Sequence, residues 1–407
     1  MEFAYWVKDR FFCSPSITSL MIYSIYYIYI CVGSLLIPAK IVDGHPSPKR
    51  GPRLKYSING FKLTCLTLIL LILFGGVIPN LSQIQLFRLA ILPDEFWSLW
   101  SVVNICALII STLLYIKGLQ GKQILGEYVD KHSHGSFGLD FWVGKELNPR
   151  IGEFDIKFVA YRVGMLFWIV LNLGFLAKQI EVEGTTTFRM LCYQFTTAFY
   201  VLDYFWNEEK MLTTWDIISE EFGYMLVFGD YVFIPFAFSV QCHYLLDYPD
   251  FHSILLPIAI LLIFFIGYYV FRTANSQKNQ YKNNPNQPIW GKPPKTLGGK
   301  LLVSGFWGIG RHTNYTGDIV MALADCLPCG TQIGGYFYVI YLFILLTHRA
   351  YRDDTKCKRK YNLLWKEYCQ TVDYVYLPFR PIDSFMSGFG KALYSITNKD
   401  DFEEKND

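Results

Sequence analysis

The sequence predicts an all-α, polytopic membrane protein with about nine or ten transmembrane helices, because of its composition and its long apolar segments. Its 407 residues are 52 % hydrophobic and 18 % aromatic, which is too apolar for an ordinary soluble surface. A bilayer core about 30 Å thick requires roughly 20 apolar residues for each helix that crosses it. The segments that meet or approach this length are 17–38, 63–79, 97–115 and 253–271.

Further apolar segments carry polar side chains within them. They are 163–177, 190–206, 222–243, 301–329 and 336–347. The first apolar segment of the chain lacks a short hydrophobic stretch followed by a small-residue cleavage site, so we expect it to stay in the protein as an anchor. We predict one membrane domain over residues 1–393 and a polar C-terminal tail over 394–407.

Lysine and arginine concentrate in alternate loops, which predicts the orientation in the membrane. The basic loops are those within 40–55, 117–145 and 272–300. By the positive-inside rule these loops are cytosolic. The N-terminus then lies on the non-cytosolic side and the C-terminal tail in the cytosol.

The ten cysteines stand mostly singly within apolar segments, which is typical of free buried thiols. Cys326 and Cys329 form the one C-x-x-C motif, but no second cysteine pair or histidine pair accompanies it. We therefore expect no metal site, and no nucleic acid partner.

A polar stripe interrupts the apolar segment 190–206. Tyr200, Asp203 and Asn207 are spaced i, i+3 and i+7, so they share one face of a helix. The spacing alone favours a hydrogen-bonded contact between helices over a proton donor that faces a cavity.

Acidic residues follow that segment at high density. We expect the side chains of Glu208, Glu209, Glu220 and Glu221 to be solvated near the membrane surface. Asp230 stands between two apolar runs, so it must be paired, protonated or next to water.

The segment 300–318 combines many kinds of polar side chain within an apolar context. If it is helical, Arg311, Asn314, Tyr315 and Asp318 share a face, where they could orient a polar ligand. An ion pair between Arg311 and Asp318 is an equally good interpretation. We expect the glycines of 305–310 to lie in a helical membrane segment, because no strand-turn-helix nucleotide loop surrounds them.

A basic cluster follows the last apolar segment, with seven cations between Arg349 and Lys366. Juxtamembrane charge bias or anionic lipid explains part of it. Together with Lys278 and Lys282, the cluster could hold a pyrophosphate and a ribose phosphate through charge-assisted hydrogen bonds.

Four motifs carry a resemblance to a known family. They are Leu301-Leu-Val-Ser-Gly-Phe-Trp-Gly308, Arg311-His-x-Asn-Tyr-x-Gly-Asp318, His348-Arg-x-x-Arg-Asp353 and Cys357-x-x-Lys-Tyr361-x-x-x-Trp365-x-x-Tyr368. With these motifs the chain resembles the membrane sterol reductases, the family of 7-dehydrocholesterol reductase, C-14 sterol reductase and the C-terminal domain of lamin B receptor. The resemblance covers nearly the whole chain.

The resemblance implies an enzyme of the endoplasmic reticulum membrane that takes NADPH from the cytosol and a sterol from the bilayer. Together with the basic cluster it assigns the cofactor to Lys278, Lys282, Leu302, Trp307, Asn314, Tyr315, Asp353, Cys357, Lys360, Tyr361 and Tyr368. It implies that Tyr200 and Asp353 line the place where the sterol double bond is protonated. Lys282 stands where an arginine is usual, and Asn362 stands where a glycine is usual.

The choice of sterol double bond depends on finer resemblances. Segments 51–60 and 289–295 look more like 7-dehydrocholesterol reductases, whereas 206–216 and 222–230 look more like the C-14 branch. We predict reduction of the C7–C8 bond, with the chain closest to 7-dehydrocholesterol reductase, and C-14 reduction as the alternative.

Two other classes remain as alternatives. A prenylcysteine-type membrane methyltransferase shares the Arg-His-x-x-Tyr pattern, but Arg352 and Asp353 stand where it has a paired glutamate. A non-catalytic scaffold similar to lamin B receptor would have a basic domain ahead of its first helix. Both are less favoured than the reductase.

Overall fold

The computed structural model describes residues 14–45, 53–76, 86–120, 134–376 and 378–397. Helices dominate these residues, and their strands form three antiparallel two-stranded hairpins. The chain divides into an N-terminal unit, residues 1–250, and a C-terminal unit, residues 251–407.

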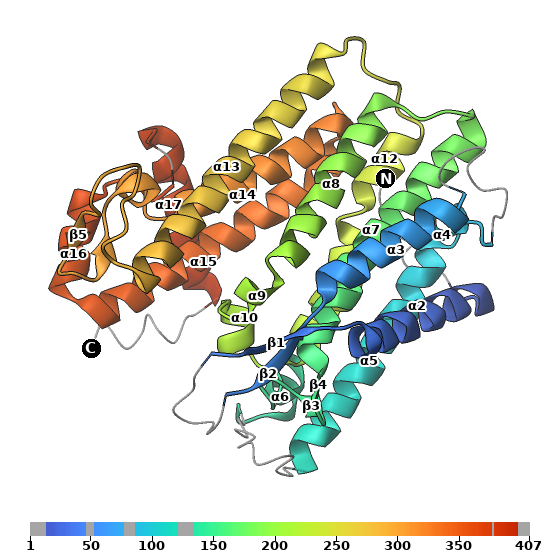
Figure 1. The fold of residues 1–407 in the computed structure, drawn as a ribbon, viewed down its shortest axis with the longest axis horizontal. Coiled ribbons are helices and arrows are strands. Elements are labelled where there is room, and N and C mark those ends of the chain that lie inside the picture. The colour runs from blue at the N-terminus through green and yellow to red at the C-terminus, as the bar shows by residue number, and fades with distance from the viewer. Residues whose placement is uncertain (1–13, 46–52, 77–85, 121–133, 377, 398–407) are drawn as a thin grey trace. The chain divides into compact units, whose positions relative to one another are not determined.

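The N-terminal unit consists of helices with two hairpins, β1–β2 and β3–β4 (Figure 1). Its strands are β1 (Lys40–Asp43), β2 (Lys55–Ile58), β3 (Arg150–Ile151) and β4 (Phe154–Asp155). Its helices are α2 (Ile17–Leu36), α3 (Gly60–Phe74), α4 (Ile91–Asp94), α5 (Phe96–Gln120), α6 (Phe137–Val143), α7 (Ile156–Glu183), α8 (Phe188–Trp206), α9 (Glu208–Met211), α10 (Trp215–Ile218), α11 (Tyr224–Phe228), a π-helix (Gly229–Ala237) and α12 (Val240–Leu246).

Helix α7 is the core of the N-terminal unit and is buried along almost its whole length. The carboxylate of Asp155 caps its first turn by accepting a hydrogen bond from the N–H of Phe158 at 2.8 Å. Gly184 ends the helix with φ +69°. Gly164 lets the π-helix approach, because a Cβ there would collide with the carbonyl oxygen of Asp230.

A buried ion pair joins α7 to the start of α9. Arg162 Nε donates to Glu208 Oε1 at 2.7 Å, and the N–H of Gly60 donates to Glu208 Oε2 at 2.9 Å. Both charged side chains are at most 2 % exposed. The prediction that Glu208 is solvated was therefore wrong, whereas Glu209 is about half exposed and pairs with Lys40 as a surface residue.

The predicted apolar segment 222–243 is interrupted rather than continuous. Its middle is the π-helix, with Pro235 inside it, between α11 and α12. Asp230 is 3 % exposed, and its Oδ2 has no hydrogen-bond partner among the described residues. Two residues of the predicted polar stripe bond to each other at the end of α8, where Asn207 Nδ2 donates to Asp203 Oδ1 at 3.1 Å.

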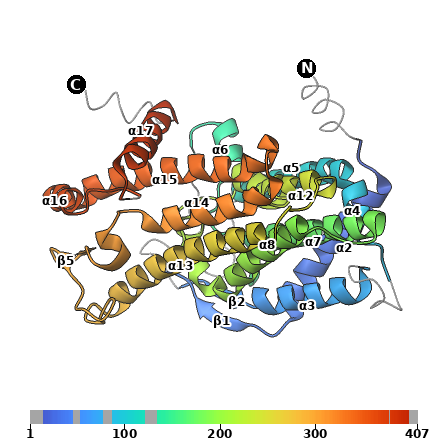
Figure 2. The same ribbon diagram turned by 90° about the horizontal axis from the view of Figure 1, so that it is seen from above.

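The C-terminal unit is built on long helices, with the β5–β6 hairpin beside them (Figure 2). Its strands are β5 (Thr296–Leu297) and β6 (Leu301–Leu302). Its helices are α13 (Leu255–Asn283), a 3₁₀ turn (Gly305–Gly308), α14 (Thr313–Cys326), two further 3₁₀ turns (Leu327–Cys329 and Ile333–Tyr336), α15 (Phe337–Tyr361), α16 (Leu363–Thr371) and α17 (Arg380–Thr397).

Helices α13 and α14 cross at two glycines. A Cβ on Gly267 would lie 2.8 Å from the carbonyl oxygen of Gly317, and a Cβ on Gly317 would lie 2.5 Å from the N of Phe271. Small residues at such a crossing let two backbones approach closely in a membrane. The prediction that the glycines of 305–310 lie in a helical membrane segment was wrong, because a strand and a 3₁₀ turn precede α14.

The described residues confirm an all-α polytopic membrane protein. Six of their helical segments are long and apolar enough to cross a bilayer: Ile17–Leu36, Phe96–Gln120, Ile156–Glu183, Tyr224–Leu246, Leu255–Asn283 and Ile333–Tyr361. The shorter α3 is also apolar, and the end of the predicted segment 63–79 lies outside the described residues. The predicted count of nine or ten includes such shorter helices.

Candidate functional site

The 3₁₀ turn of residues 305–308 is fastened to α13. The indole Nε1 of Trp307 donates to the carbonyl of Ala274 at 2.7 Å, and the N–H of Phe306 donates to Gln277 Oε1 at 2.9 Å. Gly305 has φ +62°, and a Cβ there would collide with Gln277. This position therefore requires glycine, which explains the Ser-Gly-Phe-Trp motif in structural terms.

Two of the predicted cofactor lysines lie on the same face of α13 as this turn. Asn275, Lys278 and Lys282 are spaced i, i+3 and i+7. The ammonium of Lys278 lies 4.3 Å from the centre of the Trp307 ring. Lys278 and Lys282 are exposed, so their charges are available to a ligand.

The loop before α14 is held by the segment that follows α16. Backbone N–H groups of Arg311 and His312 donate to the carbonyls of Tyr374 and Val375 at 3.0 and 2.6 Å. Arg311 Nη1 donates to the carbonyl of Val372 at 2.7 Å. Arg311 therefore precedes the helix and does not share the predicted helical face with Asn314, Tyr315 and Asp318. The alternative interpretation, an ion pair between Arg311 and Asp318, does not form either.

Helix α14 presents Asn314 and Tyr315 to two different neighbours. Asn314 Nδ2 donates to Asn275 Oδ1 of α13 at 3.2 Å, and the Tyr315 hydroxyl donates to Asp353 Oδ2 of α15 at 3.2 Å. His312 stacks on Tyr315, with ring centres 4.9 Å apart. Burial, followed by the charges of nearby lysine and arginine side chains, lowers the pKa of His312 to about 3, so the imidazole is neutral at pH 7.

The end of α15 and helix α16 form an aromatic group around the β5–β6 hairpin. Trp365 and Tyr368 are buried there, and Cys357, Tyr361 and Leu301 pack against them. The Lys360 ammonium lies 5.0 Å from the centre of the Tyr361 ring. Burial raises the pKa of Tyr368, so its phenol stays protonated.

Strand β6 joins this group to the turn on α13. Leu301 packs against the Trp365 group, whereas Leu302 packs with Trp307 and Ile289. All eleven predicted cofactor positions belong to the C-terminal unit. Tyr200 belongs to the N-terminal unit, on α8, where its ring contacts that of Trp168 with centres 6.1 Å apart.

Several polar groups near α14 have no partner among the described residues. Asn314 Oδ1 and Asp318 Oδ1 are buried acceptors without a hydrogen bond, one turn apart on α14. Lys278, Lys282 and Lys360 have no salt bridge in the described part of the chain. Since buried polar groups are normally satisfied, the two unpartnered acceptors on α14 are candidates for contact with a ligand.

Sequence reasoning missed the supporting role of Asn275 and Gln277. Asn275 positions Asn314, and Gln277 positions the turn that carries Trp307. The helical spacing of Asn275 with Lys278 and Lys282 was a signal that could have identified the first of them. No local pattern marks Gln277, because its partner is 29 residues away.

Comparisons with known proteins bear on these residues. Residues 1–380 match the model of a family described as "Ergosterol biosynthesis ERG4/ERG24 family". The chain is 41 % identical over 366 residues to a Delta(14)-sterol reductase of Arabidopsis thaliana, covering 90 % of this chain and 96 % of that protein.

Two further relatives carry the same name. The identity to a Delta(14)-sterol reductase of Dictyostelium discoideum is 39 % over 378 residues, covering 89 % of this chain and 78 % of that protein. The identity to Delta(14)-sterol reductase TM7SF2 of Mus musculus is 40 % over 353 residues, with coverages of 86 % and 82 %. The predicted closeness to 7-dehydrocholesterol reductase is therefore not supported, and the C-14 alternative fits better.

Proposed function

The chain belongs to the ERG4/ERG24 family and is a sterol reductase, and we propose that it reduces the C14–C15 double bond of a sterol with NADPH. The observation that carries this choice is the name Delta(14)-sterol reductase shared by relatives that are 38–41 % identical over most of the chain. The C7–C8 bond becomes the second candidate.

The residues of the C-terminal unit fit a dinucleotide of this kind. Lys278, Lys282 and Lys360 supply cations that form no salt bridge among the described residues, which suits phosphate groups. Asn314 Oδ1 and Asp318 Oδ1 are acceptors without partners, which suits the two amide N–H groups of a nicotinamide. When bound, NADPH supplies the hydride of the reaction.

The protein must supply a proton to the other carbon of the alkene. C14 is bonded to three ring carbons and C15 carries a hydrogen, so protonation at C15 leaves the more stable, tertiary cation at C14. A new C–H bond then forms at each carbon. An acid held where water is scarce performs such a step, and we propose Tyr200 or Asp353 for it.

We further propose that the enzyme resides in the endoplasmic reticulum membrane, with its cofactor residues facing the cytosol. The alternating basic loops support this orientation. Lys292 is exposed in the loop before β5, so Lys292→Cys is a suitable probe. Labelling of this cysteine from the luminal side alone would contradict the orientation.

The choice of bond is tested with purified protein, NADPH and two sterols. One sterol carries C8 and C14 double bonds, and the other carries C5 and C7 double bonds. We expect gas chromatography to show loss of the C14 double bond in the first sterol and no change in the second. Reduction of the second sterol alone would reject C-14 specificity and restore the C7 prediction.

The cofactor assignment is tested separately with Lys278→Ala. We expect the KM for NADPH to rise about tenfold, as for loss of one hydrogen bond to a charged group, while the KM for NADH stays unchanged. Lys366→Ala removes an exposed lysine of α16 that the cofactor assignment does not use, and it is the matched control. Equal use of NADPH and NADH by the wild type, together with an unchanged Lys278→Ala enzyme, would refute this role of the cluster.

A further inference from the structure

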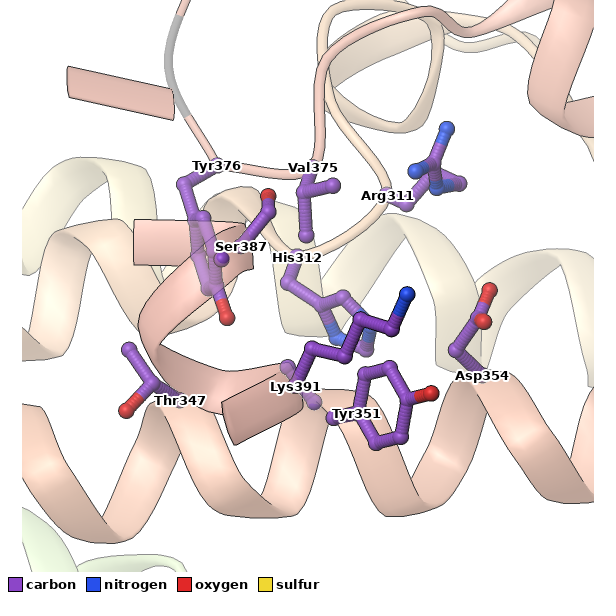
Figure 3. Close-up of a pocket in the computed structure, with 11 residues that line it drawn as sticks. Arg311, His312, Thr347, Tyr351, Asp354, Val375, Tyr376, Ser387 and Lys391 are labelled. Carbon is purple, nitrogen blue, oxygen red and sulfur yellow. The ribbon is translucent and has the colours of Figure 1, made fainter. Parts of the chain in front are cut away.

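A cavity lies within the C-terminal unit, apart from the residues assigned to NADPH. It has a volume of about 270 Å³ and is lined by the loop before α14, by α15, by Val375 and Tyr376, and by α17 (Figure 3). Its wall on α17 consists of Ser387, Gly388 and Lys391. Helix α17 begins at Arg380, where the match to the family model ends.

The cavity is distinct from the proposed cofactor site because it uses another face of α15. Its lining residues on α15 include Tyr351 and Asp354, whereas the cofactor assignment uses Asp353 and Cys357. Successive residues of an α-helix point about 100° apart, so Asp354 and Asp353 face different surroundings. His312 stands at the boundary: it lines the cavity and stacks on Tyr315.

Several polar groups that line the cavity have no protein partner among the described residues. The Ser387 hydroxyl is buried and lacks a hydrogen bond among the described residues. In the same part of the chain, none of the hydroxyls of Tyr351 and Tyr376 and the ammonium of Lys391 has a partner. Figure 3 shows the side chains of Lys391, Tyr351 and His312 together in the middle of the cavity. A cavity with this many unused donors suits a ligand that is rich in acceptors.

The charge of the cavity is positive. Arg311 Nη1 donates to backbone carbonyls. The other N–H groups of this guanidinium have no partner in the described residues. Lys391 adds a second cation. Asp354 also lines the cavity, but its carboxylate is held by Lys358 at 2.6 Å and by the indole of Trp365 at 2.9 Å.

We propose that this cavity binds a phosphate group, held by Lys391 and Arg311 and by the hydroxyls of Tyr351 and Ser387. A phosphate offers several acceptor oxygens and a negative charge, which match donors that come from different sides. The phosphate can belong to inorganic phosphate or to the headgroup of an anionic phospholipid. The headgroup is included because Phe379, Ile382 and Phe385 at the start of α17 are exposed apolar residues.

The test uses binding to the full-length protein in detergent after lipid removal. One arm titrates sodium phosphate, with sodium chloride at equal ionic strength as the reference. The other arm titrates short-chain phosphatidic acid, with phosphatidylcholine of the same chain length as the reference. Binding of phosphate itself identifies free phosphate as the ligand, and binding of phosphatidic acid alone identifies the lipid headgroup.

Two variants tie the binding to this cavity. Lys391→Ala should weaken it by about tenfold or more, as for the loss of a hydrogen bond to a charged group. Gly388→Leu should abolish it, because a Cβ at Gly388 meets nothing within 4 Å and a leucine there would fill the cavity. Leucine also has the higher helix propensity, so loss of binding in this variant does not arise from failure to fold.

Lys366→Ala is the matched control for charge and should bind like the wild type. The proposal is overturned if neither ligand binds the wild type, or if Lys366→Ala loses as much affinity as Lys391→Ala. It is also overturned if Gly388→Leu weakens NADPH binding as much as phosphate binding, because the cavity would then be part of the cofactor site. These measurements do not depend on which sterol bond is reduced.

Discussion

Two clusters of buried polar side chains in this protein differ in how many of their atoms form hydrogen bonds. In the N-terminal unit, both carboxylate oxygens of Glu208 accept hydrogen bonds, from Arg162 and from the N–H of Gly60. In the C-terminal unit, Asn314 Oδ1 and Asp318 Oδ1 are buried without a partner in the described residues. A satisfied buried group stabilises a fold, whereas unsatisfied buried acceptors indicate a place where a ligand completes the network.

The largest effect on stability is expected from breaking the satisfied group. Glu208→Gln leaves the Arg162 guanidinium buried without its counter-charge, which typically costs about 3–5 kcal/mol of unfolding free energy. Thermal unfolding in detergent measures this loss. Glu209→Gln is the control, because Glu209 is exposed and should matter by less than about 0.5 kcal/mol.

The same comparison makes the opposite prediction for Asp318→Asn. This nearly isosteric change removes an acceptor that has no hydrogen bond among the described residues, so the unfolding free energy should hardly change while turnover falls. If Asp318→Asn destabilised the protein as much as Glu208→Gln, the two clusters would both be structural.

The largest effect on turnover is expected at the proton donor. Tyr200→Phe keeps the ring and deletes the transferable proton, so turnover should fall roughly a hundredfold or more while NADPH affinity stays near that of the wild type. Asp353→Asn should impair both, since Asp353 accepts from Tyr315 within the cofactor cluster. Normal turnover in Tyr200→Phe would remove Tyr200 from the mechanism and leave Asp353 as the candidate.

A smaller effect concerns the neutral imidazole beside the cofactor cluster. The pKa of His312 is about 3 in the folded protein and about 6.5 in an unfolded chain. As the pH falls from 7 to 5, the His312 imidazole takes up a proton in the unfolded chain but not in the folded protein. The contribution of His312 to the unfolding free energy, which is present above pH 6.5, is therefore lost progressively.

We expect the wild type to lose about 1–2 kcal/mol more than His312→Phe over this range, as linkage requires. The phenylalanine retains a ring that can stack on Tyr315. Urea unfolding of both proteins at pH 7 and pH 5 gives the difference. Equal losses in the two proteins would show that His312 is protonated when folded.

The sequence predicted the membrane helices well because length and hydropathy depend on local composition alone. It failed for segment 301–329 because hydropathy does not register what Gly305 does at φ +62°. It failed for Glu208 because the partner, Arg162, is 46 residues away. The assignment of residues to the cofactor came from motifs of the family, since no spacing rule connects α13, α14 and α15.

The smallest effect is expected at Asn362, the residue that joins α15 to α16. It has φ +49° and ψ −118°, a positive φ of the kind that glycine adopts readily. The ψ value, however, lies outside the left-handed helical region and belongs to a conformation that glycine adopts most easily. Asn362 is exposed, and its side chain has no hydrogen bond in the described residues. A substitution there therefore reports on the backbone alone.

Relief of strain at Asn362→Gly is partly offset by the greater freedom of glycine in the unfolded chain. We expect Asn362→Gly to raise the unfolding free energy by up to about 1 kcal/mol. We expect Asn362→Ala to lower it by a similar amount, because alanine has no polar side chain that could form a local hydrogen bond at positive φ. Asn362 connects Tyr361 at the end of α15 to α16, the helix of Tyr368. A glycine enzyme that is more stable but has a higher KM for NADPH would show that this group is held in place at the expense of stability, as expected of a binding site and not of a structural core. If Asn362→Ala proved as stable as Asn362→Gly, the backbone at this joint would be unstrained.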